Sequence, residues 1–140
     1  MTQLFVLDNS VTMRWCFENS ANDYADAVLR YMTNNGMAIV PILWHYEVIA
    51  VLSKAQRLGS ITAYKVENFL SDLGIFSVAT DWEGGQRIFS EVRNIAVAYS
   101  LTGYDAAYLE LALRKAIPLA TLDEELQKAA RVAGVELLQP

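Results

Sequence analysis

Short apolar runs alternate with stretches of helical pattern along this chain. Each run is too short to be expected as a helix, and the runs cover residues 4–7, 37–40, 75–79, 117–120 and 135–138. Runs that are apolar throughout are typical of strands buried on both faces of a parallel sheet. Helical patterns separate them over residues 22–31, 41–58, 60–73, 82–100, 102–115 and 123–133. This alternation predicts an α/β fold, a three-layer α/β/α sandwich around a central parallel sheet of about five strands.

Length and composition predict one globular domain over residues 1–140. Hydrophobic residues make up 54% of the chain and charged residues 19%, which excludes a disordered protein. No apolar run approaches the roughly 20 residues that span a bilayer, and the N-terminus lacks the pattern of a signal peptide. Cys16 is the only cysteine, so no internal disulfide can form. We therefore expect a cytoplasmic protein without a membrane partner.

The net charge of the chain is −5. By itself, this charge argues against a general nucleic-acid binder, which usually carries a basic patch. The argument weakens if some of the acids bind a divalent cation, because the cation reverses the local field.

Four acids stand in or beside segments that should belong to the core: Asp8, Glu47, Asp105 and Asp123. Two of them follow strands, and the other two lie on helical faces that are otherwise apolar. Carboxylates are rarely buried unless they are paired or bind a metal. If the fold gathers the four, they form a set of hard oxygen ligands for Mg²⁺ or Mn²⁺, which suits phosphodiester hydrolysis.

Three of these acids also have ordinary structural interpretations. Asp8 can be a turn residue or a helix N-cap, and Asp123 can cap the helix that follows it. Asp105 stands three residues after Thr102, in the arrangement of a capping box. The ordinary interpretation of Glu47, an acid in a surface salt bridge, is disfavoured because its neighbours at helical spacing are apolar. The joint placement of the four acids, more than any one of them, indicates a site.

Two other functions remain open from the residues alone. Residues 5–12 imitate the opening motif of HAD-type phosphohydrolases, with Asp8 as the nucleophile, but Ser10 stands where the second aspartate is needed. The chain could also be a non-catalytic module that binds RNA or protein. A catalytic pair of Cys16 and the only histidine, His45, is disfavoured because both lie in apolar segments typical of packing.

The chain resembles the PIN-domain nucleases, and among them the VapC-type toxins of prokaryotic toxin–antitoxin pairs. The resemblance covers essentially the whole chain and depends on four segments: residues 5–10 (FVLDNS), 44–48 (WHYEV), 102–108 (TGYDAAY) and 119–123 (LATLD). It implies that the sheet has the strand order 3-2-1-4-5. It also implies a metal-dependent endoribonuclease that uses Mg²⁺ or Mn²⁺ to cut RNA.

The resemblance further implies a catalytic site of six side chains: the metal ligands Asp8, Asp105 and Asp123, then Glu47, which holds the ion directly or through water, and the supporting hydroxyls of Thr121 and Ser10. Many members carry one more acid after the last of these motifs, where Glu124 and Glu125 stand here. The expected partners are an RNA substrate, a cognate antitoxin whose tail blocks the site, and a second copy in a homodimer or a higher oligomer.

Overall fold

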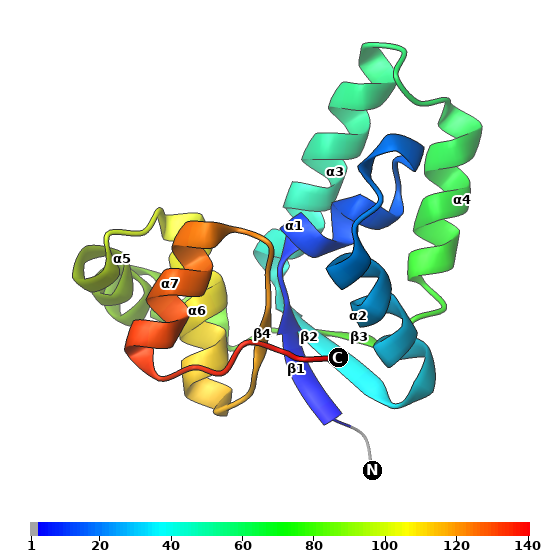
Figure 1. Ribbon diagram of the computed structural model, residues 1–140. Helices are drawn as coiled ribbons and strands as arrows, with labels where there is room; N and C mark the ends of the chain where they lie inside the picture. Colours follow the sequence, from blue (N-terminus) through cyan, green and yellow to red (C-terminus); the bar gives the residue numbers. More distant parts are fainter. Residues whose placement is uncertain (1–2) are drawn as a thin grey trace.

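Four parallel strands form one sheet at the centre of the computed structural model, which describes residues 3–140 apart from the side chain of Glu18 (Figure 1). The strands are β1 (Gln3–Leu7), β2 (Gly36–Pro41), β3 (Val78–Asp81) and β4 (Leu119–Ala120). They lie in the order β3-β2-β1-β4, and every pair is parallel. The strand order reverses between β1 and β4, which is where parallel α/β sheets bind their ligands.

Helical segments connect the strands. They are α1 (Asn9–Thr12), η1 (Met13–Trp15), η2 (Glu18–Ser20), α2 (Asp23–Asn34), α3 (Ile42–Arg57), α4 (Ala63–Leu73), η3 (Gly84–Arg87), η4 (Ile88–Val92), α5 (Arg93–Tyr99), α6 (Gly103–Lys115) and α7 (Glu124–Ala133). Asn22, Thr62 and Thr102 cap the helices that follow them with their side-chain oxygens, as such residues commonly do. None of the helices in residues 3–140 is both long and apolar enough to cross a membrane.

The helices cover both faces of the sheet, so the predicted α/β/α layers are confirmed. Helix α6 packs against β1, β2 and β4 and against α7, whereas α2 packs against β2. In Figure 1, α5, α6 and α7 lie on one side of the sheet, and α1 to α4 lie on the other. The chain first runs from β1 through β2 to β3 and later returns past β1 to β4. Connections between parallel strands are right-handed, so the two directions of travel place their helices on opposite faces of the sheet.

The core lies on both faces of the sheet, where the strands pack against helices that include α2, α3, α6 and α7. Phe5, Val6 and Leu7 of β1 are completely buried, as is expected for a central strand covered on both faces. Tyr108 and Leu109 of α6 are also completely buried. The core therefore fixes the last residues of β1 and the first turns of α6, where candidate site residues stand.

The predicted fifth strand is not formed. Leu137 makes only an isolated parallel bridge to Leu119. The amide of Leu119 donates a hydrogen bond of 2.9 Å to the carbonyl of Glu136, and the carbonyl of Leu119 accepts one of 2.8 Å from the amide of Leu138. Its partner β4 has two residues, and the preceding Pro118 has no N–H with which to extend the ladder. The segment thus occupies the place of a fifth strand without the length of one.

Two predicted boundaries between residues 75 and 100 were also wrong. The third strand begins at Val78 and continues to Asp81, two residues beyond the apolar run. The pattern over residues 82–100 is not one helix but η3, η4 and α5 in succession. A side chain at Gly84 would place its Cβ only 2.8 Å from Oδ2 of Asp81, so this glycine permits a close approach that a regular helix would not make.

Candidate active site

Asp8 stands at the carboxyl end of β1 and is only 5% exposed. It occupies the N-cap position of α1, but its side chain makes no capping hydrogen bond. Instead, Oδ2 accepts hydrogen bonds of 2.6 Å from the hydroxyl of Ser10 and 2.7 Å from the hydroxyl of Thr121. The carboxylate is therefore held in one orientation by two segments that are far apart in sequence.

These two hydroxyls also join the turn after β1 to the turn after β4. The oxygen of Ser10 accepts a hydrogen bond of 3.0 Å from the backbone amide of Leu122. The oxygen of Thr121 accepts one of 3.0 Å from the backbone amide of Asp123. Since β1 and β4 are neighbours in the sheet, both turns lie at the same edge, and Asp8 and Asp123 are brought to one place.

Asp123 is the N-cap of α7, as its structural interpretation predicted. Its Oδ1 accepts a hydrogen bond of 2.9 Å from the backbone amide of Leu126. Oδ2 makes no hydrogen bond to the described residues. A cap that uses one carboxylate oxygen leaves the other available, so the structural role of Asp123 does not exclude a functional one.

Asp105 and Glu47 approach from two helices. The backbone amide of Asp105 donates a hydrogen bond of 3.1 Å to the hydroxyl of Thr102, the N-cap residue of α6. The half-buried carboxylate of Asp105 therefore lies in the first turn of α6. Glu47 is half-buried on α3, and Oε1 accepts a hydrogen bond of 2.5 Å from the hydroxyl of Tyr108. The sequence indicated a core-facing stripe for Tyr108, but not this bond.

The four carboxylates are close enough to perturb one another. Burial raises the pKa of Asp8, and the charge of Asp123 raises it further. Burial raises the pKa of Asp105 to about 6, with added repulsion from Asp123 and Asp8. Burial also raises the pKa of Glu47, again with contributions from Asp8 and Asp105. The fold thus gathers acids from β1, α3, α6 and the start of α7 into one electrostatically coupled group, defined here as the carboxylate site.

The donor set of the carboxylate site fits a hard divalent cation. Its ligands would all be oxygens. Burial first, and then repulsion between the acids, raises the pKa values of Asp8 and Asp105, and a bound cation would offset both effects. No three His, Cys, Asp or Glu side chains within residues 3–140 are placed to enclose an ion by themselves. Mg²⁺ usually keeps several waters when it is bound, so waters would complete the coordination of an ion at this site.

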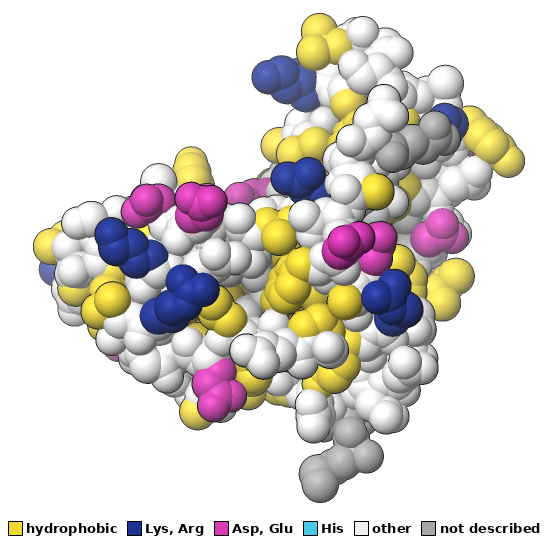
Figure 2. Space-filling view, in the orientation of Figure 1, with side chains coloured by type: hydrophobic (Ala, Val, Ile, Leu, Met, Phe, Trp, Pro, Cys, Tyr) yellow, Lys and Arg dark blue, Asp and Glu magenta, His cyan; other side chains and the backbone are white. Residues whose placement is uncertain are grey.

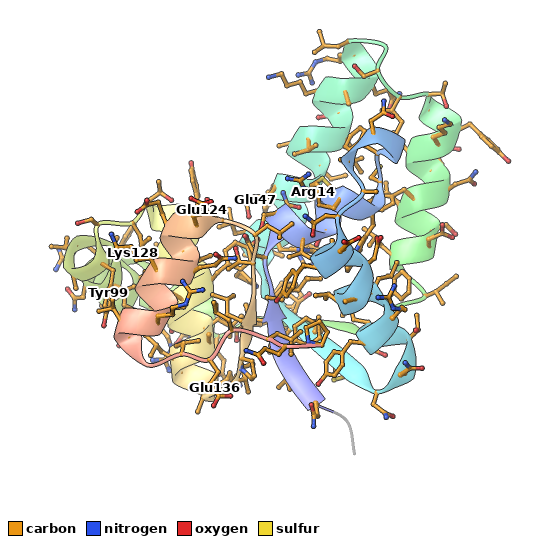
Figure 3. All side chains as sticks on the ribbon, in the orientation of Figure 1. Arg14, Glu47, Tyr99, Glu124, Lys128 and Glu136 are labelled. Carbon is orange, nitrogen blue, oxygen red and sulfur yellow. The ribbon has the colours of Figure 1, made fainter. Side chains whose placement is uncertain are left out.

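Figure 2 shows the surface hollowed between the two groups of helices. Acidic side chains gather along the edge that α6 and α7 form, and a basic side chain faces them across the hollow. Figure 3 identifies Glu124 on the α7 edge and Arg14 on the opposite edge, with Glu47 between them in this view. Arg14 is exposed on η1, six residues after Asp8. The entrance to the carboxylate site is therefore bordered by both signs of charge.

A second charged cluster lies at the end of β3, and the sequence did not reveal it. Arg114 donates hydrogen bonds of 2.6 and 3.2 Å to the two carboxylate oxygens of Asp81, and its Nε donates 2.7 Å to Glu110. All three side chains are at most 14% exposed. Burial alone would raise the pKa of Asp81, but Arg114 outweighs burial and holds it below its usual value. The i,i+4 spacing of Glu110 and Arg114 was the available signal.

Cys16 and His45 do not form a pair. The imidazole Nε2 of His45 lies 3.3 Å from the hydroxyl of Thr80, and Nδ1 lies 3.3 Å from the carbonyl of Ile42. Cys16 is half-buried among the apolar residues of the core, and burial raises the pKa of its thiol. Neither residue contributes to the carboxylate site.

The fold and the carboxylate site define an α/β protein whose site lies in the crevice where the strand order of a parallel sheet reverses. The family model of the PIN domain matches residues 5–132, so the chain belongs to the PIN domain family. PIN domains are nucleases that generally use divalent metal ions, and the resemblance seen in the sequence motifs is confirmed. No curated protein sequence matches the chain.

Three solved structures with similar folds cover nearly the whole chain. PAE2754 from Pyrobaculum aerophilum aligns with a TM-score of 0.66 and 25% identity, over 92% of this chain and 87% of that one. VapBC2 from Rickettsia felis, in a structure bound to a DNA fragment from its promoter, aligns with a TM-score of 0.65 and 15% identity, over 97% of this chain and 98% of that one. FitAcB from Neisseria gonorrhoeae aligns with a TM-score of 0.58 and 18% identity, over 97% of both chains. The last two likenesses are evidence of a shared fold.

Proposed function

We propose that the chain is a metal-dependent endoribonuclease of the VapC type. The observation that carries this proposal is the fixed carboxylate of Asp8, held by Ser10 and Thr121 beside three further acids. Membership of a nuclease family supports hydrolysis of nucleic acid. A HAD-type phosphohydrolase is not supported, because the family is a different one and Ser10 uses its hydroxyl to hold Asp8.

Asp8, Asp105 and Asp123 would hold Mg²⁺ or Mn²⁺, and Glu47 would hold it directly or through water. When bound, such an ion lowers the pKa of water and stabilises charge on a phosphate. Ser10 and Thr121 keep Oδ2 of Asp8 oriented. An ion bound there would be held by an Asp8 carboxylate whose orientation is already fixed.

RNA is the substrate that we propose. A chain with a net charge of −5 and a cluster of acids at its site needs a cation at the entrance to admit a polyanion. The exposed Arg14, on the edge opposite Glu124 in Figure 3, would contact a phosphate of the bound strand. The carboxylate site would hydrolyse the strand, and Arg14 would contribute to its binding.

We further propose an antitoxin partner and a homodimer. The similarity to VapBC2 and FitAcB supports a partner protein in this family of folds. A second copy would cover an apolar face defined by Ile42, Tyr46, Trp82, Ile88 and Phe89, which are 40 to 89% exposed. Ile42 and Ile88 line one small pocket of about 70 Å³, so the parts of this face on α3 and η4 are contiguous. Exposed apolar faces of this kind commonly mark protein interfaces.

The decisive experiment incubates the purified protein with defined RNAs in Mn²⁺ or Mg²⁺ and in EDTA. We expect cleavage with either ion and none with EDTA. Asp8→Asn should remove most activity and keep a native circular dichroism spectrum, whereas Asp72→Asn, at an exposed position on α4, should cleave as the unmodified protein does. Unchanged cleavage by Asp8→Asn would refute the assignment of the site. RNA binding without any product in Mn²⁺ would favour a non-catalytic module.

A further inference from the structure

Tyr108 connects two helices of the carboxylate site. Its ring is completely buried on α6, one turn after Asp105. Its hydroxyl donates a hydrogen bond of 2.5 Å to Oε1 of Glu47 on α3. One side chain therefore links α6 to α3 beside Asp105.

The hydroxyl of Tyr108 is the donor in this hydrogen bond, because an ionised carboxylate can only accept. The ring of Tyr108 is completely buried, so packing on α6 holds the hydroxyl where it meets Glu47. The bond therefore comes from a fixed side chain to a more exposed one.

Glu47 depends on this bond for its orientation. Its side chain is long and rotatable, and it is partly exposed at the hollow between the helices. Among the described residues, Tyr108 is the only hydrogen-bond partner of its carboxylate. The neighbouring charges, Asp8 and Asp105, repel Glu47 and would turn it outward to solvent.

We propose that Tyr108 is a positioning residue, which holds Glu47 against this repulsion so that its carboxylate faces Asp8 and Asp105. This inference deepens the proposed function and depends on it. Tyr108 uses Oε1 of Glu47 and leaves Oε2 without a bond to the described residues. Partners that orient a metal-binding carboxylate usually change metal affinity or activity by 10–100-fold when they are removed.

The test compares Tyr108→Phe with Tyr24→Phe. Each substitution keeps the ring and removes one hydroxyl, and Tyr24 donates its own hydrogen bond of 2.8 Å to the carbonyl of Leu138 outside the carboxylate site. Titration calorimetry measures Mn²⁺ affinity without RNA, and kinetics on a defined RNA measure kcat and KM. We expect Tyr108→Phe to bind Mn²⁺ about tenfold more weakly and to lower kcat at similar KM. We expect Tyr24→Phe to keep both values and to lose comparable thermal stability.

A third measurement separates this inference from the proposed function. Side-chain NMR couplings and relaxation, recorded without metal, report whether Glu47 occupies one rotamer or several. We expect one rotamer in the unmodified protein and averaging in Tyr108→Phe. A Glu47 that keeps its rotamer, or an unchanged Mn²⁺ affinity in Tyr108→Phe, overturns the role of Tyr108. If the unmodified protein neither binds Mn²⁺ nor cuts RNA, the proposed function fails, and the rotamer measurement still decides whether Tyr108 positions Glu47.

Discussion

The hydroxyl of Thr121 donates a 2.7 Å hydrogen bond to Oδ2 of Asp8, and this bond joins residues that are 113 positions apart. Thr121 is 2% exposed and Asp8 is 5% exposed, so the bond is shielded from water. The same threonine oxygen accepts a hydrogen bond from the backbone amide of Asp123. A single hydroxyl therefore sets the relation between two of the acids.

Replacement of Thr121 by valine should lower RNA cleavage by about 10–100-fold, because Asp8 loses one of its two donors and the amide of Asp123 loses its acceptor. The free energy of unfolding should fall by about 1.5–3 kcal/mol, the usual range for a hydrogen bond to a charged group. Urea denaturation and RNA kinetics measure the two effects. Thr12→Val, which removes the buried acceptor of the indole of Trp44, should cost stability but keep cleavage. Equal cleavage by both variants would contradict a special role for Thr121.

The pH dependence of stability should show the repulsion among the acids. The pKa of Asp105 rises from its usual value of 3.8 to about 6 on folding. Between these two values the folded state binds more protons than the unfolded state, so the free energy of unfolding falls as the pH rises through this range. Asp105→Asn should therefore stabilise the metal-free protein at pH 7 by about 1–2 kcal/mol, allowing for solvent screening.

The complementary measurement adds Mn²⁺ to the unmodified protein. The ion should remove the loss of stability between pH 4 and pH 7, because it neutralises the same carboxylates. Thermal unfolding at a series of pH values, with Mn²⁺ and with EDTA, records both effects. If Asp105→Asn is less stable than the unmodified protein at pH 7 in EDTA, the carboxylates are not in uncompensated repulsion.

Removal of Arg14 should weaken RNA binding without changing the chemistry. For Arg14→Ala we expect KM for RNA to rise severalfold at similar kcat, because in the proposed complex this side chain would contact a phosphate and no reacting atom. The dependence of log KM on log salt concentration should become shallower by about 0.7, the change for one contact to a single strand. Arg57→Ala, at the far end of α3, is the matched control. An identical salt dependence in both variants would exclude Arg14 from the RNA-binding surface.

Arg114→Met should destabilise the fold by about 3 kcal/mol or more, because it leaves the buried carboxylates of Asp81 and Glu110 without their main cation. Lys115→Met, at the exposed neighbouring position, should change the free energy of unfolding by less than about 0.5 kcal/mol. Chemical denaturation at pH 7 compares them. A small effect of Arg114→Met would mean that water or Arg87 replaces the lost partner.

The apolar face formed by α3, η4 and Trp82, which follows β3, should disappear from solvent in a dimer. Phe89 is 89% exposed, and Trp82 is 75% exposed. Phe89→Glu should convert a dimer to a monomer, because a charge at the centre of an apolar interface is left unpaired and desolvated. Light scattering on eluting fractions gives the mass of each species. Leu58→Glu, also exposed but at the end of α3, should leave the mass unchanged, and a monomeric unmodified protein would contradict the proposed interface.

The parts of the fold that depend on local pattern were predictable from the sequence. The apolar runs of β1 and β2 and the helix that Thr102 caps are short-range signals, and the structure contains each of them. Strand β3 extends past its apolar run to Asp81, because Arg114 on α6 stabilises this last residue. Contacts of that kind leave no local pattern, so the boundary could not be placed.

The candidate site was predictable in its acids but not in what holds them. Asp8 and Glu47 stood out because acids are unusual in apolar surroundings. The bond between Tyr108 and Glu47 was not predictable, because a buried tyrosine on an apolar stripe indicates packing, and its partner lies on another helix. The metal-binding roles of the acids stay a prediction that the cleavage and calorimetry experiments test.

The sheet exposes very little strand at its margins. Strand β4 has two residues and β3 has four, and the segment around Leu137 already occupies part of the free side of β4. A foreign strand that paired with either margin would gain only a few main-chain hydrogen bonds. Any protein that binds this molecule must therefore recognise helix surfaces and side chains, and sheet extension into aggregates is disfavoured by the same shortness.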